Sequence, residues 1–131
     1  MKGFIGNIEQ IAVGNTTFRT VIYTSRHMQL VVMALLPLED IGEETHTLDQ
    51  FVRIEEGTGK VVLDGVEYPI GNGSAVVVPA GTRHNFINTS PDKPMKLYTI
   101  YAPPDHLDGT IHQTKADAMA QDLPFDGKTT E

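Results

Sequence analysis

The chain contains no cysteine and no long hydrophobic run, and its basic residues are few and scattered. Without cysteine, it can form no disulfide framework, no thiolate metal site and no thiol nucleophile. No apolar stretch approaches the roughly 18 residues of a membrane span, and the first residues lack the apolar region of a signal peptide. We therefore expect a cytoplasmic protein with no membrane partner. The net charge of −7 also argues against a nucleic-acid partner, whose binding surface should be basic.

The length of 131 residues suits one domain, 1–131, with a real hydrophobic core. Short apolar or β-branched runs recur between turn signals such as Asp64-Gly65, and few helical patterns intervene. This pattern predicts an all-β antiparallel sandwich or barrel, with a core at about 17–104. The expected strands are Phe18–Thr24, Met28–Leu36, Phe51–Glu55, Lys60–Leu63, Val66–Ile70, Ala75–Val78, Asn85–Asn88 and Lys96–Tyr101.

The last part of the chain, about 114–131, carries the one helical signal that we identify. Thr114 is a good N-cap, and the residues from Lys115 to Gln121 are rich in alanine. Leu123-Pro124 should end this helix, and residues 126–131 are expected to form a frayed tail. We therefore predict a short C-terminal helix beside the strands.

Four polar residues have the spacing of metal ligands. Glu44 and His46 lie two positions apart, and so point to the same side of an extended strand. Gln50 keeps this parity, and His84 would come from another strand on closure of a barrel. An alternative register would use Asp49 in place of Gln50, which requires a β-bulge. Two imidazoles, one carboxylate and an amide oxygen suit one divalent metal ion: zinc, manganese, iron or nickel.

The segment around His84 resembles a motif of the cupin superfamily. Gly73, Pro79, Gly81, His84 and Asn88 match all the fixed positions of the second cupin motif, G-x5-P-x-G-x2-H-x3-N. The resemblance covers nearly the whole chain and is closest to small single-domain bacterial cupins, which often carry the label mannose-6-phosphate isomerase. It implies a double-stranded β-helix, a jelly-roll barrel, with a metal held by inward-facing ligands.

The first cupin motif matches only in part. Counting back from Gly57, the position of the family's glutamate is Gln50, that of the second histidine is His46, and that of the first histidine is Glu44. The opening glycine would fall at Leu38. A carboxylate therefore stands where the family has its first histidine, and an amide stands where the family has its glutamate. The set of ligands still carries one negative charge. An empty barrel, with Glu44 and Gln50 as solvated residues, is the alternative interpretation.

Other polar residues are expected to have structural roles. Arg53 should face away from the side that Gln50 lines and form a salt bridge, and at most one of Tyr98 and Tyr101 should line the pocket. Asn88 is expected to be a hydrogen-bonding residue of the fold. The three histidines outside the motifs are expected to be surface or packing residues; they are His27, His106 and His112.

We expect a metal-dependent enzyme that acts on a small polar substrate such as a sugar or sugar phosphate, in an isomerase-like reaction. The alternatives are a metal-dependent dioxygenase and a non-catalytic cupin that senses or stores a small molecule.

The apolar residues of the first part of the chain, including Ile5 and Phe18, predict a homodimer that pairs through N-terminal strands.

Overall fold

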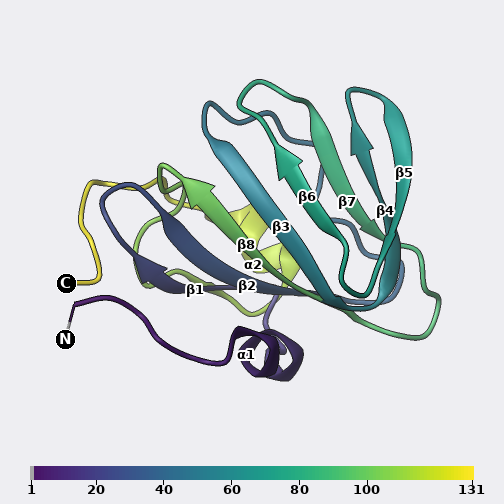
Figure 1. The fold of residues 1–131 in the computed structure, drawn as a ribbon, viewed down its shortest axis with the longest axis horizontal. Helices are drawn as coiled ribbons and strands as arrows, with labels where there is room; N and C mark the ends of the chain where they lie inside the picture. Colours follow the sequence, from purple (N-terminus) through teal and green to yellow (C-terminus); the bar gives the residue numbers. More distant parts are fainter. Residues whose placement is uncertain (1) are drawn as a thin grey trace.

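The computed structural model describes residues 2–131, which form two antiparallel β-sheets with a short helix near each end (Figure 1). The larger sheet has the strand order β6-β3-β8-β2-β1-β9 and the smaller one the order β5-β4-β7. The strands of the larger sheet are β1 (Arg19–Thr24), β2 (Gln29–Leu35), β3 (Asp49–Glu56), β6 (Ala75–Val78), β8 (Met95–Ala102) and β9 (Ile111–His112). Those of the smaller sheet are β4 (Thr58–Leu63), β5 (Val66–Gly71) and β7 (His84–Asn88).

The two sheets pack on a shared hydrophobic core. On β3, Val52 and Ile54 are fully buried and alternate with more exposed residues, because successive side chains of a strand point to opposite faces. Val61 of β4 and Phe86 of β7 belong to the same core cluster. The core therefore joins the larger sheet to the smaller one, as the predicted all-β sandwich requires.

All eight predicted strands are present, with ends within two residues of those expected. The hairpin between β4 and β5 turns at Asp64 and Gly65, which have φ angles of 48° and 82°. A two-residue turn with both φ angles positive matches the twist of the strands that it joins. The short strand β9 was not predicted; its two residues are too few to give an alternating pattern.

Helix α2 (Lys115–Ala120) begins where the sequence predicts, since Thr114 and Asp117 form a reciprocal capping box. Helix α1 (Ile8–Gly14) was not predicted. Its N-cap is Asn7, whose Oδ1 accepts a hydrogen bond from the backbone of Gln10, and Ala12 is buried. The segment expected to supply N-terminal strands is therefore partly helical and lies beside the larger sheet (Figure 1).

The C-terminal residues are held in place, contrary to the frayed tail expected for 126–131. The backbone N–H of Thr130 donates to the carbonyl of Thr24 over 2.9 Å, and the Tyr23 hydroxyl donates to Glu131 over 2.6 Å. Glu131 also accepts a hydrogen bond from the backbone of Gly3, so the first residues that the structure describes lie beside the C-terminal residue (Figure 1). Within residues 2–131, no helix has the length and apolar character needed to cross a membrane.

An irregular segment between β2 and β3 runs along the edge of the smaller sheet. Asp40 pairs with Ile87, and Glu44 pairs with His84, each through an isolated antiparallel bridge. Leu38, which stands where the first cupin motif has glycine, adopts a φ of 65°. This left-handed conformation is easiest for glycine, which explains the residue type that the motif has at this turn.

Candidate metal site

Glu44, His46 and His84 come together where this irregular segment meets β7. The backbones of Glu44 and His84 exchange two hydrogen bonds of 2.9 Å each, so the two residues are directly opposite each other. The Oε2 of Glu44 is 3.4 Å from the Nε2 of His46. The rings of His46 and His84 lie 5.0 Å apart between centroids. Three of the four predicted ligands are therefore neighbours.

Both histidines turn the Nδ1 atom toward an oxygen acceptor. The Nδ1 of His84 lies 2.8 Å from the carbonyl oxygen of Thr82, and because a carbonyl only accepts, this nitrogen carries the proton. The Nδ1 of His46 faces the carboxylate of Asp105 at 4.0 Å, and its Nε2 faces Glu44. Metal-ligating histidines typically have such a partner on the nitrogen that does not bind the metal. In the neutral imidazole, this arrangement leaves the lone pair on Nε2 of His84, where it could bind a metal ion.

Gln50 lies on the inner face of β3 and is only 4% exposed. It is paired with Tyr101 on β8, whose ring lies edge-on to His46 at 5.9 Å, so Gln50 belongs to the same face. Its Nε2 donates to the hydroxyl of Thr99 over 3.0 Å. Its buried Oε1 has no hydrogen-bond partner anywhere in residues 2–131, which is costly unless another group binds it.

Asp49 does not take the place of Gln50. Its side chain is exposed, and its Oδ1 accepts a hydrogen bond from the backbone of Ala80 over 2.8 Å. The pairing of β3 with β8 is regular from Asp49 to Ile54, without the bulge that an inward-facing Asp49 would need. The structure thus favours the register in which Gln50 faces inward.

The donor set suits a divalent metal ion in chemistry, and one pair of donors also has the spacing of metal ligands. Two donor atoms bound at about 2.1 Å from a metal at a tetrahedral angle are about 3.4 Å apart, which is the separation of the Glu44 and His46 donors. Across the described part of the chain, no three His, Cys, Asp or Glu side chains converge closely enough to hold a metal as they stand. Glu44 has room to adjust, since 38% of its side chain is exposed.

A second group of polar residues, centred on the buried His106, adjoins this site, and the sequence did not reveal it. His106 lies 5.2 Å from the Tyr101 ring in an edge-on arrangement, and its Nδ1 donates to Asp122 over 2.9 Å. Its Nε2 is 3.4 Å from Asp105, the same carboxylate that faces His46. No local pattern points to this cluster, because Asp105 and Asp122 are far from His46 in the sequence.

Arg19 of β1 and His112 of β9 lie at the far end of this second group. Arg19 is buried, and its Nη1 lies 3.5 Å from Asp122 and 3.1 Å from the Nδ1 of His112. Burial alone would raise the pKa of Asp122, but the hydrogen bond from His106 and the charge of Arg19 help to bring it below its usual value. His106 and His112 are therefore buried and hydrogen-bonded, whereas His27 is exposed, as expected.

Other predictions for polar residues are confirmed. Arg53 forms an ion pair of 3.3 Å with Glu55. Of the two tyrosines, only Tyr101 contacts a site histidine, and Tyr98 packs on Phe51. Asn88 is fully buried and donates from its Nδ2 to three backbone carbonyls, those of Leu35, Leu36 and Lys93.

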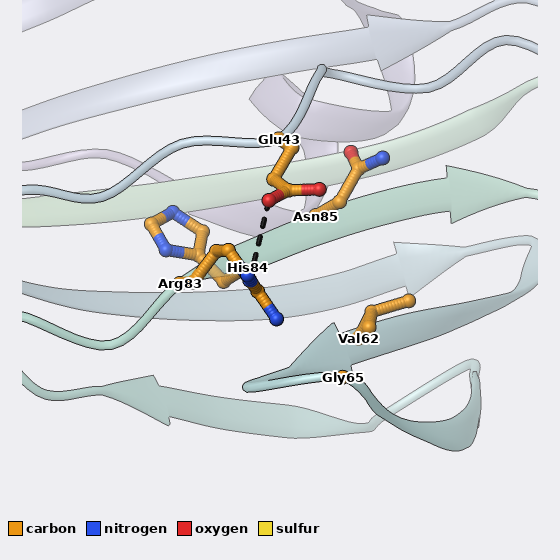
Figure 2. Close-up of a pocket in the computed structure, with 6 residues that line it drawn as sticks. All are labelled: Glu43, Val62, Gly65, Arg83, His84 and Asn85. Carbon is orange, nitrogen blue, oxygen red and sulfur yellow. Dashed lines mark ion pairs between the residues drawn. The ribbon is translucent and has the colours of Figure 1, made fainter.

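Two hollows lie near the candidate site. One, of about 110 Å³, is closed on one side by a 3.2 Å ion pair between Arg83 and Glu43, and Figure 2 shows that the imidazole of His84 points away from this pair. The other is a groove of about 300 Å³ between α2 and the segment 41–44. Glu44 lines this groove together with Arg19 and Asp122, so the groove reaches one of the four candidate ligands.

Comparison with known proteins identifies the family. Residues 31–101 match the family described as Cupin domain. The chain belongs to the cupin family. YrkC of Bacillus subtilis (strain 168) is 49% identical to this cupin over 126 residues, which are 91% of this chain and 67% of YrkC. Protein L612 of Acanthamoeba polyphaga mimivirus is 43% identical over 82% of this chain and 70% of its own length.

A solved structure shares the fold of this chain over most of its length. The crystal structure of BH2720 from Bacillus halodurans superposes with a TM-score of 0.89 at 43% sequence identity. The match covers 92% of this chain and 96% of BH2720. The expectation of a small single-domain cupin with a jelly-roll fold and a short C-terminal helix is therefore confirmed.

Proposed function

We propose that this cupin is a metal-dependent enzyme that acts on a small polar organic substrate, with Glu44, His46, Gln50 and His84 as ligands of one divalent ion. The observation that supports the proposal is that Glu44, His46 and His84 are neighbours, and that donor atoms of His84 and Gln50 are left without a hydrogen-bond partner in residues 2–131. His84 has Nδ1 engaged and Nε2 free, and the buried Oε1 of Gln50 is without a partner in residues 2–131. The carboxylate of Glu44 supplies the negative charge that a divalent ion requires.

The residues around the donors suit chemistry on an oxygen-containing substrate. A bound divalent ion would polarise a carbonyl or hydroxyl oxygen of the substrate. Burial raises the pKa of Tyr101, so its phenol stays neutral beside His46 and adds no charge to the site. Glu44 lies at the boundary between the donors and the groove beside α2, where the substrate enters.

The charges of the groove favour a neutral substrate such as a sugar over a sugar phosphate. A phosphate needs a free cation, but the cations nearby are engaged: Lys115 is paired with Asp40, Arg83 with Glu43, and Arg19 with Asp122. We therefore infer an isomerase-like reaction on a hydroxylated aldehyde or ketone.

Reconstitution with single metals tests this function. The protein is stripped with a chelator and reloaded with Zn²⁺, Mn²⁺, Fe²⁺ or Ni²⁺ in separate samples, and each is incubated with neutral aldoses, ketoses and their phosphates. We expect isomerisation of a neutral sugar that requires metal and is absent in Glu44→Ala. Metal binding without turnover of any substrate would instead indicate a binding protein.

Dioxygenase activity is a second candidate because of the donor set. Two histidines and one carboxylate, which Glu44, His46 and His84 supply, are the donors of many non-haem iron oxygenases. Measurement of oxygen consumption by the Fe²⁺-loaded protein, with the Zn²⁺-loaded protein as control, distinguishes the two reactions. Consumption that depends on both Fe²⁺ and an organic substrate would favour the dioxygenase.

We also infer a homodimer that uses the first part of the chain. Ile5 is 88% exposed and Val13 is 36% exposed, whereas Phe18 is buried in the core of its own chain. Exposed apolar side chains that gather into a patch are typically covered by a partner. Light scattering on the purified protein tests the inference: a mass of two chains is expected, and Ile5→Asp should lower it to one.

A further inference from the structure

We propose that the C-terminal segment positions one of the metal ligands: Asp122 holds His106, His106 holds Asp105, and Asp105 orients the imidazole of His46. This inference rests on the proposed metal site and extends it to residues outside both cupin motifs. Neighbouring side chains of this series are 2.9 Å, 3.4 Å and 4.0 Å apart in this order; the first distance is a hydrogen bond, and the other two are wider approaches of a ring nitrogen to a carboxylate oxygen.

The backbone that carries Asp105 and His106 is fixed on both sides. The buried amide of Gln29 accepts hydrogen bonds from the backbone N–H groups of Asp105 and His106, over 3.2 Å and 3.0 Å. It also donates to the carbonyl of His106 over 2.8 Å. Three hydrogen bonds from one buried side chain leave this turn little freedom, so the orientation of its side chains depends on their own partners.

The segment after α2 supplies one of these partners. His106 forms a β-bridge with Pro124, and the backbone N–H groups of Leu107 and Phe125 donate to the carbonyls of Leu123 and Asp105, each over 3.1 Å. These contacts fix the position of Asp122, the residue just before this pairing. Its carboxylate then reaches His106 at one oxygen and Arg19 at the other.

Within the described residues, the His106 ring forms a hydrogen bond through only one of its two nitrogens. It is 3% exposed, its Nδ1 is bound by Asp122, and its buried Nε2 forms no hydrogen bond within residues 2–131. Asp105 is the carboxylate next to this Nε2, and its Oδ2 is the same atom that faces Nδ1 of His46. The outer partner of a metal-bound histidine fixes the orientation of its ring. A substitution of Asp122 should therefore change the orientation of the His46 imidazole.

A double-mutant cycle on Zn²⁺ affinity tests this series of contacts. The variants are Asp105→Asn, Asp122→Asn and the two combined, with Asp126→Asn as the matched control, since Asp126 is exposed and its side chain accepts a hydrogen bond from the backbone of Lys128. Zn²⁺ affinity is measured by competition with a chromophoric chelator. Asp105→Asn should weaken binding about tenfold, Asp122→Asn severalfold, and Asp126→Asn not at all.

The Zn²⁺ affinity of the double variant Asp105→Asn/Asp122→Asn distinguishes coupled from independent effects. If Asp122 acts through Asp105, the double variant binds Zn²⁺ no more weakly than Asp105→Asn alone, whereas independent effects would multiply. Multiplied effects, or an Asp122→Asn affinity equal to that of Asp126→Asn, would overturn the inference and leave the proposed function intact. A wild-type protein that binds no Zn²⁺, Mn²⁺, Fe²⁺ or Ni²⁺ would overturn both. Circular dichroism checks the fold, and His106→Gln replaces Asp122→Asn in the cycle if that variant does not fold.

Discussion

Segment 73–88 reaches the candidate site on a tightly determined backbone, whereas segment 38–57 reaches it partly over an irregular loop. In the first, Gly73 and Gly81 have φ angles of 84° and 85°, and Asn88 is fully buried. In the second, Leu38 occupies a left-handed turn, and Glu44 is partly exposed. Positions such as Gly73 and Asn88, which determine the backbone conformation, therefore tolerate little change in residue type. A ligand position such as Glu44 requires only a side chain with a suitable donor atom for the metal.

The largest effect should come from Asn88, which belongs to the determined segment. Asn88→Ala leaves three backbone carbonyls without this donor in a buried position, and should lower the free energy of unfolding by about 3 kcal/mol or more. Urea denaturation measures the change. Asn72→Ala is the control, because the Asn72 side chain is exposed and accepts one hydrogen bond, from Gly57. Equal losses in the two variants would contradict the distinction between these positions.

Glu44 should dominate the metal affinity of the irregular segment. Glu44→Gln removes the carboxylate that faces His46, and we expect Zn²⁺ affinity to fall about 100-fold or more, since even outer-shell changes reach this size. The neighbouring Glu43→Gln loses only an exposed ion pair with Arg83 and should bind Zn²⁺ normally. The chelator competition assay compares the two, and a similar loss in both would remove Glu44 from the site.

Gln50 tests whether the exchange of ligand types is functional. Gln50→Glu places a second carboxylate at the donors and should strengthen Zn²⁺ binding about tenfold, because the charge count of the ligands sets affinity for divalent ions. Asp49→Asn, on the opposite face of β3, should leave the affinity unchanged. If Gln50→Glu weakened binding or Asp49→Asn abolished it, the assignment of the inward-facing ligand would be wrong.

Asp40 forms an ion pair that links the irregular segment to α2, and this pair should make the stability of the protein depend on pH. The hydrogen bonds from Lys115 and Asn85 hold the pKa of Asp40 below its usual value of 3.8. A lowered pKa in the folded state stabilises the protein above pH 3.8, and this contribution is lost as the pH falls further. Wild type should exceed Asp40→Asn in stability at pH 7 by less than about 1 kcal/mol, as for other exposed ion pairs. The two should converge near pH 2 in urea denaturation, and a constant difference would contradict this.

The smallest effect is expected at Leu38, which is 65% exposed and has a φ of 65°. Leu38→Gly removes the strain of the left-handed conformation but frees the unfolded chain, so stability should change by under about 1 kcal/mol. Leu36→Gly, at a position that is also exposed but has no positive φ, should lose about 0.5–1 kcal/mol. A greater loss for Leu38→Gly than for Leu36→Gly would show that the turn does not favour glycine.

Local patterns in the sequence were sufficient for most of the fold. Alternating apolar residues placed the eight main strands, and Asp64-Gly65 and Thr114 marked a hairpin and a helix start. Helix α1 had a weaker signal, namely Asn7 as a cap followed by Ile8, Ile11 and Ala12 on one face. Helix α1 has too few residues for a helical repeat of apolar residues to be distinguished from the alternation of a strand.

The candidate site was predictable only where a motif fixes the spacing. The parity along one strand placed Gln50 inward and Asp49 outward, and the second cupin motif identified His84. The contacts of His106 with Asp122 depend on how the C-terminal segment returns beside β1 and β9. Such long-range pairing leaves no spacing rule in the sequence, which is why His106 was expected only to pack or lie at the surface.

The metal content of the wild-type protein and of the Glu44→Ala/His84→Ala double variant tests the central claim most directly. Both are purified without added metal, their fold is checked by circular dichroism, and their bound zinc, manganese, iron and nickel are measured by elemental analysis. We predict a stoichiometric amount of one divalent metal in the wild type and its loss from a folded double variant. An unchanged metal content in the double variant would contradict the assignment of this site.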